Sequence, residues 1–139
     1  MTGAILLMAA ELSTVASVDV ASGACHVIND ANPALADRCE LSGLERHGGA
    51  FLLLGAVALT MAFGAGPGAS RPAALALIAI AAVVLALALL RDLPETRETG
   101  AIGMNFEGAS GAAGPGLYLE IAAGLLLASA GALALARRR

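Results

Sequence analysis

Three acidic side chains lie in or beside long apolar runs of the chain, where ionised groups are rare. Glu11 lies inside the first run, Asp19 lies near the end of that run, and Glu120 lies inside the last run. A carboxylate at the centre of a bilayer-spanning helix costs about 3 kcal/mol on insertion scales, so such a residue is a functional hypothesis by default. A buried carboxyl group can exchange a proton or pair with a cation. Glu11, Asp19 and Glu120 are therefore the candidate proton or cation site.

Glu11 needs a partner, because the apolar runs contain no Lys, Arg or His. Three interpretations remain open. Glu11 is protonated or hydrogen-bonded to a hydroxyl or backbone group of a neighbouring helix, which is the structural interpretation. Alternatively it faces a wet cavity as a proton or cation site, or it forms a salt bridge with a partner subunit.

The overall composition indicates the surroundings of these acids. Of the 139 residues, 58 % are hydrophobic and 14 % are charged, whereas soluble domains average roughly 25 % charged residues. This excludes an ordinary cytosolic globule and indicates a bilayer as solvent. The net charge of −3 and the absence of Lys exclude a nucleic-acid-binding protein.

Four apolar runs of roughly the 20 residues needed to cross a bilayer follow one another along the chain. We predict an all-α protein, a four-helix transmembrane bundle forming one domain over residues 1–139. The runs cover residues 3–20, 48–66, 73–90 and 117–136, and the two longer loops cover residues 21–47 and 91–116. The first run lacks a basic start, so we expect it to be retained rather than cleaved as a signal peptide.

The charges at the ends of the runs predict the orientation. The carboxyl tail ends in three Arg residues and the short 65–72 connection carries Arg71, whereas both longer loops are rich in acids. By the positive-inside rule both termini should be cytoplasmic and both longer loops should face outward. The Ala/Gly-rich runs and the use of Arg alone as basic residue suggest the cytoplasmic membrane of a bacterium.

Both cysteines fall in the first outer loop. In an oxidising compartment Cys25 and Cys39 are expected to form a disulfide, with a short helix over residues 33–41 carrying Cys39. Two free thiols are one alternative. A metal site formed with His26 and His47 is another, although the spacing matches no structural zinc pattern. We therefore expect no metal and no cofactor.

Small residues at four-residue spacing predict the faces on which the helices pack. Glu120 shares such a stripe in the last run, and further stripes lie in the first two runs. The predicted packing residues are Gly124, Ala128 and Ala132 in the last run, Ala9, Ser13 and Ser17 in the first, and Ala56, Thr60 and Gly64 in the second.

Two family resemblances follow from these features. Ala10-Glu11 with Thr14 resembles the first helix of small multidrug-resistance transporters, which would imply a dimeric, proton-coupled cation exporter with Glu11 as its shared site. This chain has longer loops and no Trp. The four runs with two cysteines in a larger first loop are similar to claudin-type tetraspan proteins.

The function predicted from the sequence is a non-enzymatic structural or accessory subunit that packs against itself or against a larger membrane complex. The alternative is a small proton- or cation-coupled transporter or channel that uses Glu11 and Glu120. An enzyme has the least support, because no catalytic constellation or cofactor motif is present. The expected partners are the lipid bilayer, other copies of the chain or other membrane subunits, and not nucleic acid.

Overall fold

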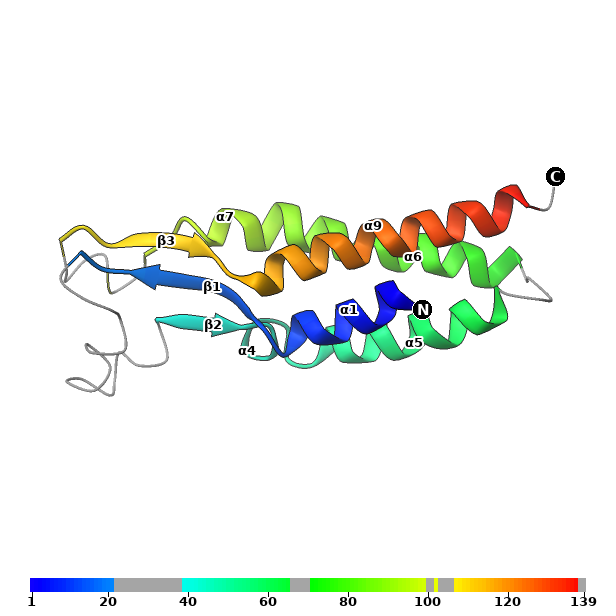
Figure 1. Ribbon diagram of the computed structural model, residues 1–139, viewed down its shortest axis with the longest axis horizontal. Coiled ribbons are helices and arrows are strands. Elements are labelled where there is room, and N and C mark those ends of the chain that lie inside the picture. The colour runs from blue at the N-terminus through cyan, green and yellow to red at the C-terminus, as the bar shows by residue number, and fades with distance from the viewer. Residues whose placement is uncertain (22–38, 66–70, 100–101, 103–106, 138–139) are drawn as a thin grey trace.

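Four helices lie side by side in the computed structural model of the protein, which describes residues 1–21, 39–65, 71–99, 102 and 107–137 (Figure 1). The bundle helices contact one another in the pairs α1–α5, α1–α9, α5–α6 and α6–α9. Their bounds are α1 Thr2–Glu11, α5 Ala50–Gly64, α6 Arg71–Leu87 and α9 Pro115–Ala136.

A three-stranded antiparallel sheet extends from one end of the bundle (Figure 1). Its strands are β1 Thr14–Asp19, β2 Glu40–Ser42 and β3 Ser110–Ala113, in the order β2-β1-β3. Ser17 of β1 pairs with Glu40 on one side and with Ala112 on the other. The protein is mostly helical, as predicted, but the sheet corrects the expectation of an all-α fold.

The first predicted helix is the main error of the sequence-based fold. α1 ends at Glu11, and residues 14–19 form strand β1 instead of continuing the helix to residue 20. The segment after Glu11 contains Ser, Thr and Val, which favour turns and strands over helix interiors. The Ser13 hydroxyl donates a 2.8 Å hydrogen bond to the carbonyl of Ala9 at this helix end.

In the described part of the chain, two helices are long and apolar enough to cross a membrane. They are Arg71–Glu95, with 25 residues, and Pro115–Ala136, with 22 residues. α5 has 15 residues and α1 has 10, which correspond to about 22 and 15 Å of helix, short of the roughly 30 Å hydrocarbon core. Two of the four predicted membrane spans are therefore supported by helix length, and the other two are not. Length and composition of this kind also occur in buried helices of soluble proteins.

The third predicted span is longer than its apolar run. α6 continues through a π-helical turn, η1 Ala88–Asp92, into the short helix α7 Leu93–Glu95. A π-turn pairs each residue with the fifth one along, so it holds more residues per turn than an α-helix. Residues four apart then stay on one face, and both Ala88 and Asp92 are buried.

The interior of the bundle is built mainly from apolar side chains, with the buried carboxylates of Glu11 and Glu120 near its sheet end. Its largest cluster joins all four bundle helices, with buried members Ala4, Leu7, Phe51, Ala58, Leu77, Ile80, Ala81, Val84, Ala123 and Leu127. Large apolar side chains also cover the outside of the bundle. Leu53, Leu75 and Leu133, for example, are 72, 55 and 58 % exposed.

The first outer loop is described only near its carboxyl end. Cys25 and most of the predicted 33–41 helix lie outside the described residues, so the disulfide stays a prediction. Cys39 is buried beside β1 in a small cluster with Val18, Val20 and Ile102. The residues after it form β2 and a one-turn helix, α4 Gly43–His47.

Candidate functional site

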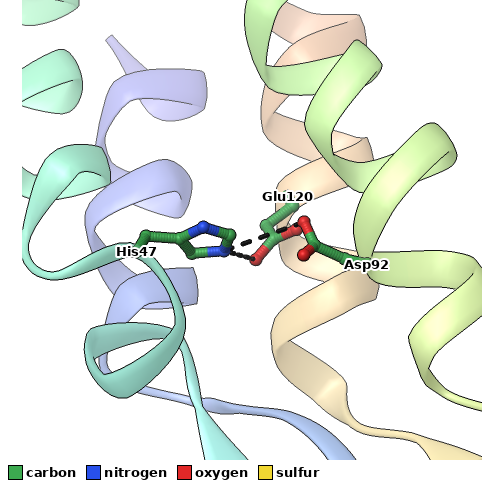
Figure 2. A group of neighbouring side chains, drawn as sticks. All are labelled: His47, Asp92 and Glu120. Carbon is green, nitrogen blue, oxygen red and sulfur yellow. Dashed lines mark hydrogen bonds and ion pairs between the residues drawn. The ribbon is translucent and has the colours of Figure 1, made fainter. Parts of the chain in front are cut away.

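A polar cluster lies where the helical bundle meets the sheet. It consists of His47 from α4, Asp92 from η1 and Glu120 from α9, whose side chains point toward one another (Figure 2). The side chains are 4, 0 and 0 % exposed, respectively. Three segments far apart in the sequence thus bring one imidazole and two carboxylates into one buried position.

Local sequence signals place His47 at the end of α4. The helix begins with a capping box, in which the Ser42 hydroxyl accepts from the Glu45 backbone N–H and the Glu45 carboxylate accepts from the Ser42 backbone N–H. Hydrogen bonds from the Ser42 side chain and backbone lower the pKa of Glu45. The chain then turns through Gly48 and Gly49, with φ of 61° and 87°, values that favour glycine.

The imidazole ring is fixed by stacking. The rings of His47 and Phe51 have centroids 4.1 Å apart and planes at 27°. Phe51 is itself fully buried at the start of α5. The stacked ring presents Nε2 to both acids, at 3.3 Å from Glu120 Oε1 and 3.8 Å from Asp92 Oδ2.

Both carboxylates keep an oxygen without a hydrogen bond, although Asp92 Oδ2 lies 3.8 Å from His47 Nε2. Asp92 Oδ2 and Glu120 Oε2 are buried and accept no hydrogen bond from the described residues. A buried carboxylate oxygen without a donor is costly, so each such atom requires an explanation. One ligand atom from each of the three side chains lies within 4.8 Å of the other two.

Arg46 joins this cluster to the surface. Its Nε donates a 2.9 Å hydrogen bond to Asp92 Oδ1, and its Nη2 forms an ion pair with Glu95 at the rim. Burial opposes the charged guanidinium, but the hydrogen bond with Asp92 and the charges of Glu95 and Asp92 prevail and raise the pKa of Arg46. The arginine thereby attaches α4 to the extension of α6.

Glu11 contacts backbone groups at the start of a neighbouring helix, as in the structural interpretation left open by the sequence. Its Oε1 accepts a 2.6 Å hydrogen bond from the Gly49 backbone N–H, and its Oε2 accepts a 3.2 Å bond from that of Phe51. Gly49 is the N-cap of α5 and has no capping side chain. Glu11 supplies this cap from another helix and lies at the positive end of the helix dipole.

The three acids singled out in the sequence are not brought into one site. Glu11 contacts the start of α5, Glu120 contacts His47, and Asp19 is exposed at the end of β1 beside Ser110. No hydrogen bond or ion pair joins any two of the three in the described part of the chain. Their role as a proton or cation site stays a prediction.

His47, Asp92 and Arg46 were missed as members of a common site. The sequence placed His47 among the loop cysteines and used Arg46 and Asp92 only as loop charges. One signal was available. All three are polar residues at the ends of apolar runs, and these ends lie at the same end of a four-helix bundle, so the residues could have been expected near one another. Their partners, 46 and 73 residues away, are set by the fold alone.

The predicted packing stripes are partly used. Gly124 is buried, and a Cβ atom at this position would lie 2.7 Å from Leu85 Cγ in α6. Ala128 is half-buried, whereas Ala132 is exposed, because four-residue steps drift about 40° each around a helix with 3.6 residues per turn. The face continues through Gly131 instead.

Of the three packing residues predicted in the first run, only Ala9 lies on a helix, and it is half-buried. Ser13 follows α1, and Ser17 lies in strand β1, so their assignment to a helical stripe is wrong.

No protein-family model, curated protein or solved structure matches the chain. The resemblances to small multidrug-resistance transporters and claudin-type proteins therefore remain predictions.

Proposed function

We propose that this chain is a non-enzymatic structural or accessory subunit of a bacterial cytoplasmic membrane. In this proposal it packs through its helices against a second copy of itself or against a larger membrane complex. Both termini are cytoplasmic, and the sheet with its polar cluster faces outward.

The observation that carries the proposal is the apolar interior of the bundle below the acids. Among the described residues, the buried polar or charged side chains are Glu11, Asp92, Thr96 and Glu120. They lie in the part of the bundle nearest the sheet, and the other buried side chains of the four helices are apolar. The hydroxyls of Thr60 and Ser129 are exposed, and each donates to a carbonyl of its own helix. In the described residues there is thus no polar track along which a proton or cation could cross.

The contacts of the acids agree with a structural role. Glu11 caps α5, and Asp92 is held by Arg46. These groups tie the elements at the outer end of the bundle to one another. The alternative, a proton- or cation-coupled transporter, would require a connection from Glu11 or Glu120 toward the opposite end.

A stripe of small residues on the exposed side of α5 supports association with a helix outside the bundle. Ala56, Thr60 and Gly64 follow one another at four-residue spacing on α5, and all three are exposed. Small residues let transmembrane helices approach closely. This stripe offers such a contact outside the bundle.

The distribution of charge supports the orientation. Arg71 begins α6 and Arg137 follows α9, and these helix ends lie together at the end of the bundle away from the sheet (Figure 1). The described acids other than Glu11 and Glu120 lie in the sheet or in α4, η1, α7 and the segments that adjoin them. Positive residues at the cytoplasmic end are the expected pattern.

Oligomeric state and flux together test the proposal. The purified protein is analysed by native mass spectrometry and chemical crosslinking, beside Ala56→Leu, Gly64→Leu and the control Val57→Leu on the same exposed helix. We expect a defined assembly, weakened about tenfold by each stripe variant and unchanged in the control. A monomer with no stoichiometric partner would contradict the proposal. Proton-coupled cation flux in liposomes that Glu11→Gln abolishes without disturbing assembly would establish the transporter instead.

A further inference from the structure

We propose that His47, Asp92 and Glu120 form a binding site for one divalent transition-metal ion of the Zn²⁺ class. The inference rests on ligand geometry and is independent of the structural role proposed above. It also replaces the expectation from the sequence that the chain binds no metal.

The donor atoms have the separations that a small coordination sphere needs. Ligands at the usual Zn–N and Zn–O bond lengths lie about 3.4 Å apart around a tetrahedral ion. His47 Nε2 lies 3.3 Å from Glu120 Oε1 and 3.8 Å from Asp92 Oδ2. All three side chains offer a ligand atom within 4.8 Å of the others. A closure of less than about 1.5 Å, within the reach of side-chain rotation, would complete the set.

The unpartnered oxygens point to a missing cation. Asp92 Oδ2 and Glu120 Oε2 are buried without a hydrogen-bond donor from the described residues. Arg46 supplies one positive charge here against three carboxylates, those of Asp92, Glu120 and, at the rim, Glu95. A divalent ion would coordinate oxygens that have no hydrogen-bond donor and would balance the two remaining negative charges.

The surroundings of the ligands are those of a built site. Arg46 holds Asp92 through Oδ1, which leaves Oδ2 free toward the other two ligands. Phe51 stacks on the imidazole and fixes the direction of Nε2. Such outer contacts orient ligands before the metal binds.

The donor set favours a transition metal over Ca²⁺ or Mg²⁺. An imidazole nitrogen suits Zn²⁺ and its neighbours in the series, and three protein ligands leave a fourth position for water. Ca²⁺ requires six to eight oxygen ligands, and Mg²⁺ requires an octahedral shell that retains several waters. A buried cluster of three side chains does not provide either shell.

Metal binding is measured on the full chain, purified in detergent and stripped with a chelator. Equilibrium dialysis against ZnCl₂ with elemental analysis gives stoichiometry and affinity, and Co²⁺ substitution gives an absorption spectrum of the ligand set. We expect one Zn²⁺ per chain, not displaced by equal Ca²⁺ or Mg²⁺. His47→Ala, Asp92→Asn and Glu120→Gln should each raise the Kd for Zn²⁺ at least about tenfold.

The control is Glu98→Gln, which alters an exposed acid outside the cluster and should retain the metal. Wild-type protein that takes up no stoichiometric Zn²⁺ would overturn the inference and leave an ion-pair cluster only, whatever the variants do. Equal affinity in the wild type and the three ligand variants would overturn it as well. Displacement by equal Ca²⁺ or Mg²⁺ would overturn the assignment to a transition metal. Circular dichroism identifies a variant that has lost its fold, and the wild-type Co²⁺ spectrum then tests whether the ion is bound in a four-coordinate site.

Discussion

Glu11 caps helix α5 at Gly49, the N-cap residue 38 positions later, because its carboxylate accepts a 2.6 Å hydrogen bond from the backbone N–H of Gly49. A second bond from Phe51 satisfies another of the free N–H groups at the start of α5. Glu11, an acid in an otherwise apolar segment, therefore supplies the hydrogen-bond acceptors that cap the start of a neighbouring helix. This relationship explains why an ionisable residue occurs at the end of an otherwise apolar segment.

Replacement of Glu11 should destabilise the fold in proportion to the acceptors lost. Glu11→Gln retains one acceptor oxygen, and we expect it to lower the free energy of unfolding by about 1–2 kcal/mol. Glu11→Ala leaves two N–H groups without a partner and should cost about 2–4 kcal/mol. Chemical denaturation in detergent measures both, with Glu98→Gln as an exposed control. Equal stability of all three variants would contradict the capping role.

The pair of Arg46 and Asp92 should be strongly coupled. Arg46→Ala leaves the buried Asp92 carboxylate without its cation, so we expect a loss of about 3 kcal/mol. Asp92→Asn in the same chain should recover part of this loss, with a coupling energy of about 1–3 kcal/mol. Denaturation in the presence of EDTA separates this effect from metal binding. Arg91→Ala, an exposed neighbour, is the control and should change stability by less than about 0.5 kcal/mol.

How far the sequence predicts this fold depends on the range of the interactions. The helices over α6 and α9 were found because a long apolar run is a local signal. The prediction of one helix over residues 3–20 failed because an apolar run of Val and Ala can form either a helix or a strand. Only the run of Ser, Thr and Val after Glu11 distinguishes β1 from a helix.

The site is harder to predict because its members are distant in the sequence. Glu120 and Glu11 were identified as unusual, but their partners could not be assigned without the packing of α4 against α6 and α9. One local hint was present, since Gly49, the N-cap of α5, has no side chain that could cap the helix. A helix that lacks a cap indicates that another part of the chain supplies it.

The contact of α9 with α6 should depend on Gly131. A Cβ atom there would lie 2.8 Å from the carbonyl oxygen of Ala74, a backbone atom that cannot rotate away. We expect Gly131→Ala to cost about 1–3 kcal/mol by overpacking. The matched control is Gly64→Ala in α5, where the added methyl would meet only Ala73 Cβ at 3.6 Å. If thermal unfolding shows the same effect for both variants, close packing at Gly131 is not the cause.

The capping box of α4 should make a small part of the stability depend on pH. Hydrogen bonds from Ser42 lower the pKa of Glu45 below its ordinary value of 4.5. A lowered pKa in the folded protein gives a contribution that is present above about pH 4.5 and is lost as the pH falls through the folded value. The wild type should therefore have a higher Tm than Glu45→Ala at pH 7. This difference should disappear in acid.

Ser42→Ala provides the control for that measurement, because it removes the hydroxyl that lowers the pKa of Glu45. Its Tm difference from the wild type should show the same pH dependence, and the double variant should add little to either single one. A Tm difference for Glu45→Ala that stays constant between pH 7 and pH 3 would exclude the capping box as its origin.

The last prediction concerns the disulfide between Cys25 and Cys39. Cys39 is 3 % exposed, and it lies in the cluster that attaches the first loop to β1. A bridge closing a loop of this length would stabilise the fold by roughly 3 kcal/mol in the chain-entropy model. Cys25→Ser and Cys39→Ser should each lose about that amount, and the double variant should lose no more than either. Alkylation of the denatured protein without reductant should modify neither thiol, with a mobility shift only after reduction. Modification of both thiols before reduction would show that the cysteines are not paired and would weaken the outward orientation of this loop.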